Sequence, residues 1–284
     1  MEAPQLQLIS VNGQQLAVWD WPGEDPPLVF AHATGFHARC WDCIIRMFPG
    51  RHRIALDARG HGRSSKPDPP YRWRDFGKDL AAVAERLHVR HALGIGHSSG
   101  GHMTALAAAL RPETFAALLL LDPTIYPREE YGTPAPDASF TLRRRAVWNS
   151  PDEMFERFRD RHPFSLWQPD ILRDYCDFGI LPNGSGHVLA CPPVVEESIY
   201  ANSKTPESDV YPEIATIWQP VVVMRAGITH TPDTFDLAAS PTAVNLASKF
   251  AHGRDIVLPG CSHYIPMEMP DRVAEEITRL ACAS

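Results

Sequence analysis

The sequence predicts an α/β fold, in which a mainly parallel sheet is flanked by helices and carries an inserted helical cap. Short continuous apolar runs alternate with segments of helical spacing, which is typical of strands covered by helices on both faces. A glycine-rich turn at residues 96–101 joins one apolar run to a segment rich in Ala and Leu. Between residues 128 and 215 the pattern changes, because charged, aromatic and proline residues mix and no core-type strand is apparent.

The first part of the chain begins with a predicted β-hairpin. Asn12-Gly13, a strong two-residue turn signal, separates residues 6–11 from residues 14–19. Pro26-Pro27 ends the hairpin, which we expect at the edge of the sheet. Buried strands are then expected at residues 28–31, 52–56, 92–95 and 116–121, and helices at about residues 41–47, 73–87 and 103–110.

The chain after residue 127 divides into the cap and a return to the core. We expect the cap to span residues 128–215, so that residues 1–127 and 216–284 form the core domain. Four segments of the cap have helical character, at about residues 139–148, 151–161, 169–178 and 193–202. The core then resumes with predicted strands at residues 221–225 and 254–258 and predicted helices at residues 242–250 and 272–282.

Length, charge and hydropathy limit the kinds of partner. The chain has 284 residues, 44% of them hydrophobic and 21% charged, which suits a globular protein with a large core. Its formal net charge of -7 and pI near 6.0 offer no basic face, so neither nucleic acid nor a membrane is an expected partner. No apolar run approaches the roughly 20 residues that span a bilayer, and the N-terminus lacks a signal-peptide pattern. We therefore expect a cytoplasmic protein, while its oligomeric state stays open.

The cysteines and histidines do not form a metal-binding pattern. The six cysteines are scattered, and Cys40-Trp41-Asp42-Cys43 is a lone C-x-x-C with no second pair to complete a zinc site. The thirteen histidines include no H-E-x-x-H pair, and His61 and His97 are interpreted as loop residues. We expect free thiols, no metal and no cofactor.

The predicted chemistry centres on Gly96-His97-Ser98-Ser99-Gly100. The pattern G-x-S-x-G between a strand and a helix indicates a sharp turn that exposes the serine hydroxyl. Glycines are needed because side chains two residues either side of Ser98 would collide with the turning chain. The Ser99 N–H at the start of the helix then becomes available to a developing oxyanion.

Other polar loops are expected at the same edge of the sheet. In parallel α/β sheets, ligands bind beyond the carboxyl ends of the strands, and residues 32–36, 57–64 and 96–101 follow such ends. His263 also follows a predicted strand. Because a serine hydroxyl needs an imidazole to remove its proton, we expect His263 to meet Ser98.

Four short motifs occur along the chain. They are His32-Ala33-Thr34-Gly35, Asp57-x-Arg59-Gly60-x-Gly62-x-Ser64, Gly96-His97-Ser98-Ser99-Gly100-Gly101 and Gly260-x-x-His263. Together they resemble the α/β-hydrolase superfamily along nearly the whole chain, in its cap-containing form with a serine nucleophile. The resemblance implies Ser98 as nucleophile, His263 as its general base, and the backbone N–H groups of Thr34 and Ser99 as the oxyanion hole.

The acidic member of the triad departs from the usual pattern of the superfamily. The turn after the strand at residues 221–225 contains no carboxylate, and His230 occupies the expected place. Asp233 and Asp236 are the nearest acids beyond it. Asp122, which follows an earlier strand, looks like the acid of one haloalkane dehalogenase branch and of some lactonases. We favour Asp122 over Asp233 and leave both open.

Asp57 and Arg59 are expected to brace the loop beside the oxyanion hole rather than to transfer protons. Aromatic residues are expected to line the substrate pocket, namely Phe36, Tyr126, Trp148 and Trp167, together with Phe164 and Tyr200.

The expected function is that of a cofactor-free serine hydrolase. The dehalogenase-like branch uses an aspartate nucleophile, so the serine at position 98 disfavours dehalogenation and epoxide opening. The remaining chemistry is acyl transfer from a carboxylic ester or lactone through an acyl-enzyme. Two alternatives stay open: hydrolysis of a carbon–carbon bond by the same triad, and a non-catalytic receptor that retains the triad.

Overall fold

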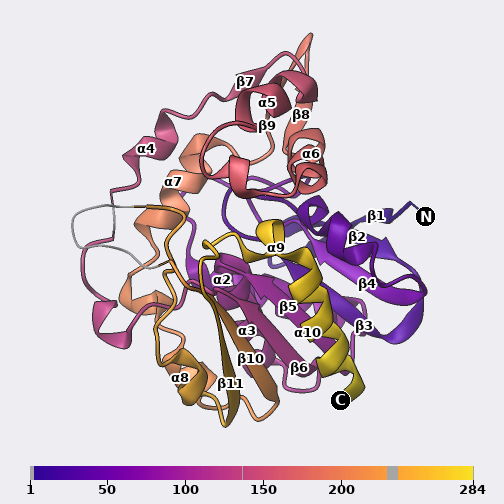
Figure 1. Ribbon diagram of the computed structural model, residues 1–284, viewed down its shortest axis with the longest axis vertical. Coiled ribbons are helices and arrows are strands. Elements are labelled where there is room, and N and C mark those ends of the chain that lie inside the picture. The colour runs from indigo at the N-terminus through magenta and orange to yellow at the C-terminus, as the bar shows by residue number, and fades with distance from the viewer. Residues whose placement is uncertain (1–2, 136, 229–235, 284) are drawn as a thin grey trace.

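Eight strands form the central sheet of the computed structural model, in the order β1-β2-β4-β3-β5-β6-β10-β11 (Figure 1). The structure describes residues 3–135, 137–228 and 236–283. Only the pairs β1–β2 and β2–β4 of this sheet are antiparallel, so the prediction of a mainly parallel sheet is confirmed. The strands are β1 (Gln5–Val11), β2 (Gln14–Trp21), β3 (Glu24–Ala31), β4 (Arg51–Leu56), β5 (Ala92–His97), β6 (Phe115–Leu121), β10 (Pro220–Ala226) and β11 (His252–Leu258).

Helices cover both faces of the sheet. Val29 and Ala31 of β3 share one buried cluster with α2 and α3, whereas Leu28 and Phe30 share another with α1 and α10. The apolar run is continuous because alternate side chains enter two different cores. The helices that flank the sheet are α1 (Asp42–Ile45), α2 (Trp73–Arg86), α3 (Ser99–Leu110), α9 (Ile265–Glu268) and α10 (Pro270–Ala283), with two 3-10 turns, η1 (Ala38–Trp41) and η5 (Leu246–Lys249).

The segment between β6 and β10 gathers mostly at one end of the molecule, above the sheet in Figure 1. The boundaries of the cap domain, at residues 128 and 215, stay a prediction. The last of its helices, α8, packs against α3. Its helices are α4 (Ser139–Leu142), α5 (Pro151–Phe158), α6 (Pro169–Phe178), α7 (Pro193–Ala201) and α8 (Tyr211–Ile214), with the 3-10 turns η2 (Arg128–Glu130), η3 (Phe164–Leu166) and η4 (Pro206–Ser208).

This segment also contains a small sheet that the sequence analysis missed. Three strands pair in the antiparallel order β7-β9-β8, with bounds β7 (Val147–Trp148), β8 (Ile180–Asn183) and β9 (Gly186–Leu189). The helix expected over residues 139–148 therefore ends at Leu142. The physical reason is that Val147 and Trp148 pair with β9, which buries the indole of Trp148.

The helix expected over residues 242–250 is also wrong, since only the 3-10 turn η5 forms there. Thr242 instead donates its hydroxyl to Pro123 O at 2.7 Å, and the Ala243 N–H donates to Ile125 O at 2.9 Å. These tertiary hydrogen bonds hold the chain extended beside the end of β6, where an α-helix would not reach them.

Candidate active site

Ser98 occupies a strained turn between β5 and α3, with φ 56° and ψ -122°. Its N–H donates to Leu121 O at 3.0 Å. Gly96 and Gly100 permit the turn, because a Cβ at Gly100 would overlap the carbonyl oxygen of Ala31, and one at Gly96 would overlap Gly100. The sequence therefore folds into the predicted elbow for steric reasons.

The structure brings Ser98, His263 and Asp122 together from the ends of three strands. His263 Nε2 lies 2.9 Å from Ser98 Oγ, and His263 Nδ1 lies 2.7 Å from Asp122 Oδ2. Asp122 is completely buried. Such a chain of hydrogen bonds can pass a proton from the hydroxyl to the imidazole while the carboxylate holds the ring. His230 and Asp233, the other residues considered for this site, lie outside the described residues.

The second carboxylate oxygen of Asp122 accepts two full hydrogen bonds. Its Oδ1 receives the Ala226 N–H at 3.0 Å and the Ser240 hydroxyl at 2.6 Å. Thr242 Oγ1 lies 3.2 Å from Oδ1, but its single proton is shared with Pro123 O at 2.7 Å. Asp122 also has a positive φ of 41°, and its N–H donates to Met224 O at 2.7 Å. These contacts fix which oxygen faces His263 and compensate the buried charge.

His97 holds the backbone of His263 in place. Its Nε2 lies 2.8 Å from His263 O, and the two rings are 5.1 Å apart. Burial, reinforced by repulsion from His263, lowers the pKa of His97 to about 3, so its ring is neutral and donates through Nε2. The prediction that His97 is a loop residue is wrong, because it is the last residue of β5 and pairs with Leu121 of β6.

The two residues expected to form the oxyanion hole are adjacent in space. Thr34 Oγ1 donates to Ser99 Oγ at 3.0 Å, which joins the loop after β3 to the start of α3. Within the described part of the chain, neither backbone N–H has a hydrogen-bond acceptor. An unpaired donor at the start of α3 and another in the adjoining loop after β3 are suited to an oxyanion.

Two neutral histidines order the loop that contains Thr34. His61 Nε2 accepts the Gly35 N–H at 3.0 Å and its Nδ1 lies 2.9 Å from Arg59 O. His32 Nε2 likewise accepts the Ala58 N–H at 3.0 Å. Burial lowers the pKa of both imidazoles, so each keeps one nitrogen free to accept a bond. His61 lies in a loop, as its sequence context predicts, but the role of its ring is visible only in the structure.

Asp57 and Arg59 lie where bracing residues are expected. Asp57 Oδ1 accepts the Ala38 N–H at 2.7 Å, and its Oδ2 accepts the Arg63 N–H at 3.0 Å. Arg59 forms a two-pronged ion pair with Asp79 of α2. Asp57 therefore fixes loop backbone, while Arg59 ties its loop to the side chains of α2. Among the described contacts, neither side chain reaches Ser98 or His263.

Phe36 and Trp167 form part of an apolar wall beside the two site histidines. The Phe36 ring lies edge-on to His97 at 6.2 Å, and the Trp167 ring is 5.5 Å from Phe36. Tyr264 completes the wall, with its ring 5.7 Å from that of His263 and 5.3 Å from Trp167.

The other aromatic residues expected at the pocket have ring partners other than the two site histidines. Trp148 packs on Phe158 at 5.4 Å within the cap. Among the described residues, none of the four rings has a contact with His97 or His263, and their substrate role stays a prediction. The four are Tyr126, Trp148, Phe164 and Tyr200.

A cap cation lies against the loop after β3. Arg144 forms an ion pair with Glu196 of α7, and its Nη2 donates to the Tyr175 hydroxyl at 3.1 Å. A Cβ at Gly35 would lie 3.2 Å from Glu196 Oε1 and 3.4 Å from Arg144 Nη1. The pair therefore sits directly beside the residue that follows Thr34.

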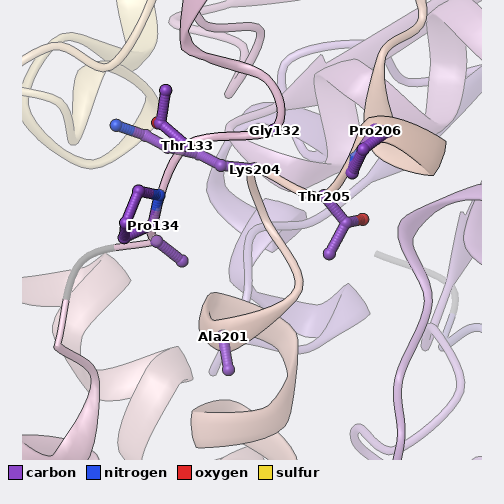
Figure 2. A pocket seen from close by; sticks show the side chains of 8 residues that line it. Gly132, Thr133, Pro134, Ala201, Lys204, Thr205 and Pro206 are labelled. Carbon is purple, nitrogen blue, oxygen red and sulfur yellow. The ribbon is translucent and has the colours of Figure 1, made fainter.

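A separate surface pocket, of about 300 Å³, lies between the segment after η2 and the segment after α7 (Figure 2). Its cation, Lys204, pairs with Glu130 at 2.6 Å and lies 4.7 Å from the centre of the Tyr126 ring. No predicted catalytic residue lines it. The lining residues are Gly132, Thr133, Pro134, Ala135, Ala201, Lys204, Thr205 and Pro206.

The described residues contain no group of three or more His, Cys, Asp or Glu side chains arranged to hold a metal ion. Among these same residues, no helix is both long and apolar enough to cross a membrane.

The sheet order and the strand–serine–helix turn define the class of α/β hydrolases. The chain belongs to the alpha/beta hydrolase family, whose model matches residues 28–276. It is 24% identical over 262 residues to the 2-(acetamidomethylene)succinate hydrolase of Mesorhizobium japonicum, which covers 90% of this chain and 88% of the relative.

Solved structures agree with this family membership. The crystal structure of an E-2-(acetamidomethylene)succinate hydrolase has a TM-score of 0.81 and 21% identity, covering 98% of this chain and 99% of that chain. An N-acyl homoserine lactone degrading enzyme has a TM-score of 0.66 and 20% identity, covering 96% of this chain and 99% of that chain. At these identities the likeness establishes the fold, and the resemblance inferred from the four sequence motifs is confirmed.

Proposed function

We propose that this α/β hydrolase is a serine hydrolase that cleaves a carboxylic ester or lactone through an acyl-enzyme. The observation that carries the proposal is the hydrogen-bonded chain from Ser98 Oγ through the His263 ring to Asp122. A positioned imidazole makes a serine hydroxyl a competent nucleophile at neutral pH by taking its proton.

The proposed reaction has two halves. Ser98 Oγ attacks the carbonyl carbon while its proton passes to His263 Nε2, and the oxyanion accepts the Thr34 and Ser99 N–H groups. His263 then protonates the leaving alcohol. Water activated by His263 hydrolyses the acyl-enzyme, and the proton returns to Ser98. These steps need no cofactor.

The test replaces Ser98 and measures both turnover and covalent labelling. Ser98→Ala should lower kcat for short p-nitrophenyl esters by at least about 10,000-fold. It should also abolish labelling by a fluorophosphonate. Ser248→Ala is the matched control, because that exposed serine donates only to Asn245 O. Undiminished turnover in Ser98→Ala would remove the proposal, and an unlabelled parent that binds ligand without turnover would favour a receptor.

A second candidate is hydrolysis of the amide of a small carboxylic acid. It is favoured by the relative that spans most of the chain, whose name describes an acetamido derivative of succinate. The cation for such a substrate would be Arg144, which exchanges Glu196 for the substrate carboxylate. Carbon–carbon bond hydrolysis uses the same three residues and is tested by adding diketones to the substrate panel.

Charge-neutral replacement of the cap pair tests the preference for acidic substrates. The double variant Arg144→Gln/Glu196→Gln leaves no unpaired buried charge. For carboxylate-bearing esters and amides, KM should rise about 10- to 100-fold, because the binding free energy of one charged hydrogen bond is lost. For uncharged esters of the same size, KM should stay unchanged. Equal changes for both sets would exclude Arg144 as the selective group.

A further inference from the structure

Thr124 contacts the hydroxyl of Ser98, and the proposed reaction gives it no role so far. Its Oγ1 lies 3.0 Å from Ser98 Oγ, and its N–H donates to Ser98 O at 3.0 Å. The residue follows β6 two positions after Asp122 and is buried. Thr124 is thus tied to Ser98 through both its backbone and its side chain.

The direction of the hydroxyl–hydroxyl bond follows from the rest of the site. A carboxylate can only accept, so Asp122 Oδ2 requires the proton of a neutral His263 on Nδ1. His263 Nε2 is then an acceptor and receives the Ser98 proton. The bond between the two hydroxyls must therefore use the Thr124 proton, which points at Ser98 Oγ.

We propose that Thr124 is a catalytic residue whose hydroxyl donates to Ser98 Oγ and stabilises negative charge on that oxygen when the acyl-enzyme breaks down. The inference rests on the proposed serine chemistry. In deacylation, water adds to the acyl carbon and gives a proton to His263. The C–Oγ bond then breaks, its electron pair stays on Oγ, and His263 returns the proton to Oγ.

The two halves of the reaction should depend on Thr124 to different extents. In deacylation Ser98 Oγ is the leaving group, and a donor at 3.0 Å lowers the energy of its developing charge. In acylation the same donor engages a lone pair of the attacking oxygen, which offsets the benefit. Loss of the Thr124 hydroxyl should therefore slow deacylation more than acylation.

The test is Thr124→Val, which keeps the shape and the backbone N–H but removes the hydroxyl. With p-nitrophenyl acetate, whose leaving group departs readily, kcat should fall about 10- to 100-fold. KM should fall with it, so that kcat/KM changes by less than about threefold, and stopped-flow traces should show a full burst of acyl-enzyme. Thr124→Ser should restore the parent constants.

Controls separate this role from simple structural support. Thr141→Val removes another buried threonine hydroxyl, which donates to Ala138 O in the cap, and should leave the burst and both constants unchanged. If Thr124→Val does not fold by circular dichroism, Thr124→Ala is measured in the same way. An equal loss of kcat and kcat/KM without accumulated acyl-enzyme, or unchanged kinetics, overturns the inference. Retained turnover in Ser98→Ala would instead overturn the serine chemistry itself.

Discussion

Replacement of Asp122 by Asn tests how the carboxylate sets the protonation of His263. Two donors converge on Asp122 Oδ1, the Ala226 N–H and the Ser240 hydroxyl. In Asp122→Asn these donors retain the amide oxygen on their side, so the NH2 group must face His263 Nδ1. The ring then carries its proton on Nε2, where it can no longer accept the proton of Ser98.

The expected loss is large because the fold allows no compensating flip. Turning the amide around would set its NH2 against the Ala226 N–H and the Ser240 hydroxyl in a fully buried site, at a cost of several hydrogen bonds. With the wrong tautomer locked, kcat should fall by about 10,000-fold, equivalent to about 5 kcal/mol in the barrier. The free energy of unfolding should change much less, since the shape of the side chain is conserved.

The assay measures kcat with p-nitrophenyl acetate at pH 7 to 9, alongside labelling by a fluorophosphonate. Asp233→Asn is the matched control, and it should keep the parent activity if Asp122 is the acid. A tenfold loss or less in Asp122→Asn, together with a loss of about 10,000-fold in Asp233→Asn, would refute the assignment of Asp122.

Three further predictions concern the turn, the oxyanion loop and acid stability. Gly100→Ala should lower Tm by about 5 °C or more and abolish esterase activity, because its methyl group overlaps the carbonyl of Ala31; a parent-like melting curve would contradict this reasoning. His61→Leu should lower kcat about 10- to 100-fold by leaving the Gly35 N–H unpaired, while His61→Gln, which keeps an acceptor, should lose less; equal losses would exclude the hydrogen bond as the cause. Burial lowers the pKa of His102 to about 4, so the unfolded chain binds the extra proton below about pH 6.5. Stability supplied by neutral His102 is complete above pH 6.5 and is lost as pH falls toward 4, at about 1.4 kcal/mol per pH unit. The free energy of unfolding, measured by denaturant melts between about pH 4 and 6.5, should depend less steeply on pH in His102→Gln than in the parent. An unchanged pH dependence would contradict the prediction.

The elements that followed from local pattern were predicted well. The Asn12-Gly13 hairpin and the buried strands formed because each needs only neighbouring residues to specify it. The hairpin of β8 and β9 turns differently, because Asn183 pairs with Gly186 and the two-residue loop is Gly184-Ser185, with φ 60° at Gly184. The predicted helix over residues 242–250 is wrong because hydrogen bonds to the end of β6, distant in sequence, override its local helical pattern.

Some residues of the candidate site could be recognised from their neighbours in the sequence, and others act on residues that are distant in the chain. Ser98 and Ser99 could be identified from the sequence because the glycine spacing of the turn has a local steric cause. Thr124, His61 and His97 carried no comparable signal, since each acts on a residue far away in the chain. Each of the three lies within five residues after a predicted buried strand, and that position was the hint the sequence offered.

The sequence by itself determined the class of fold and the elbow around Ser98, indicated His263 as its partner, and left the acid open between Asp122 and Asp233. Only the tertiary structure decided that His263, 165 residues from Ser98 and 141 from Asp122, meets both side chains within hydrogen-bond distance. The physical reason is that periodicity and steric demand act over a few residues, whereas the position of a buried carboxylate depends on which distant donors reach it once the strands have paired.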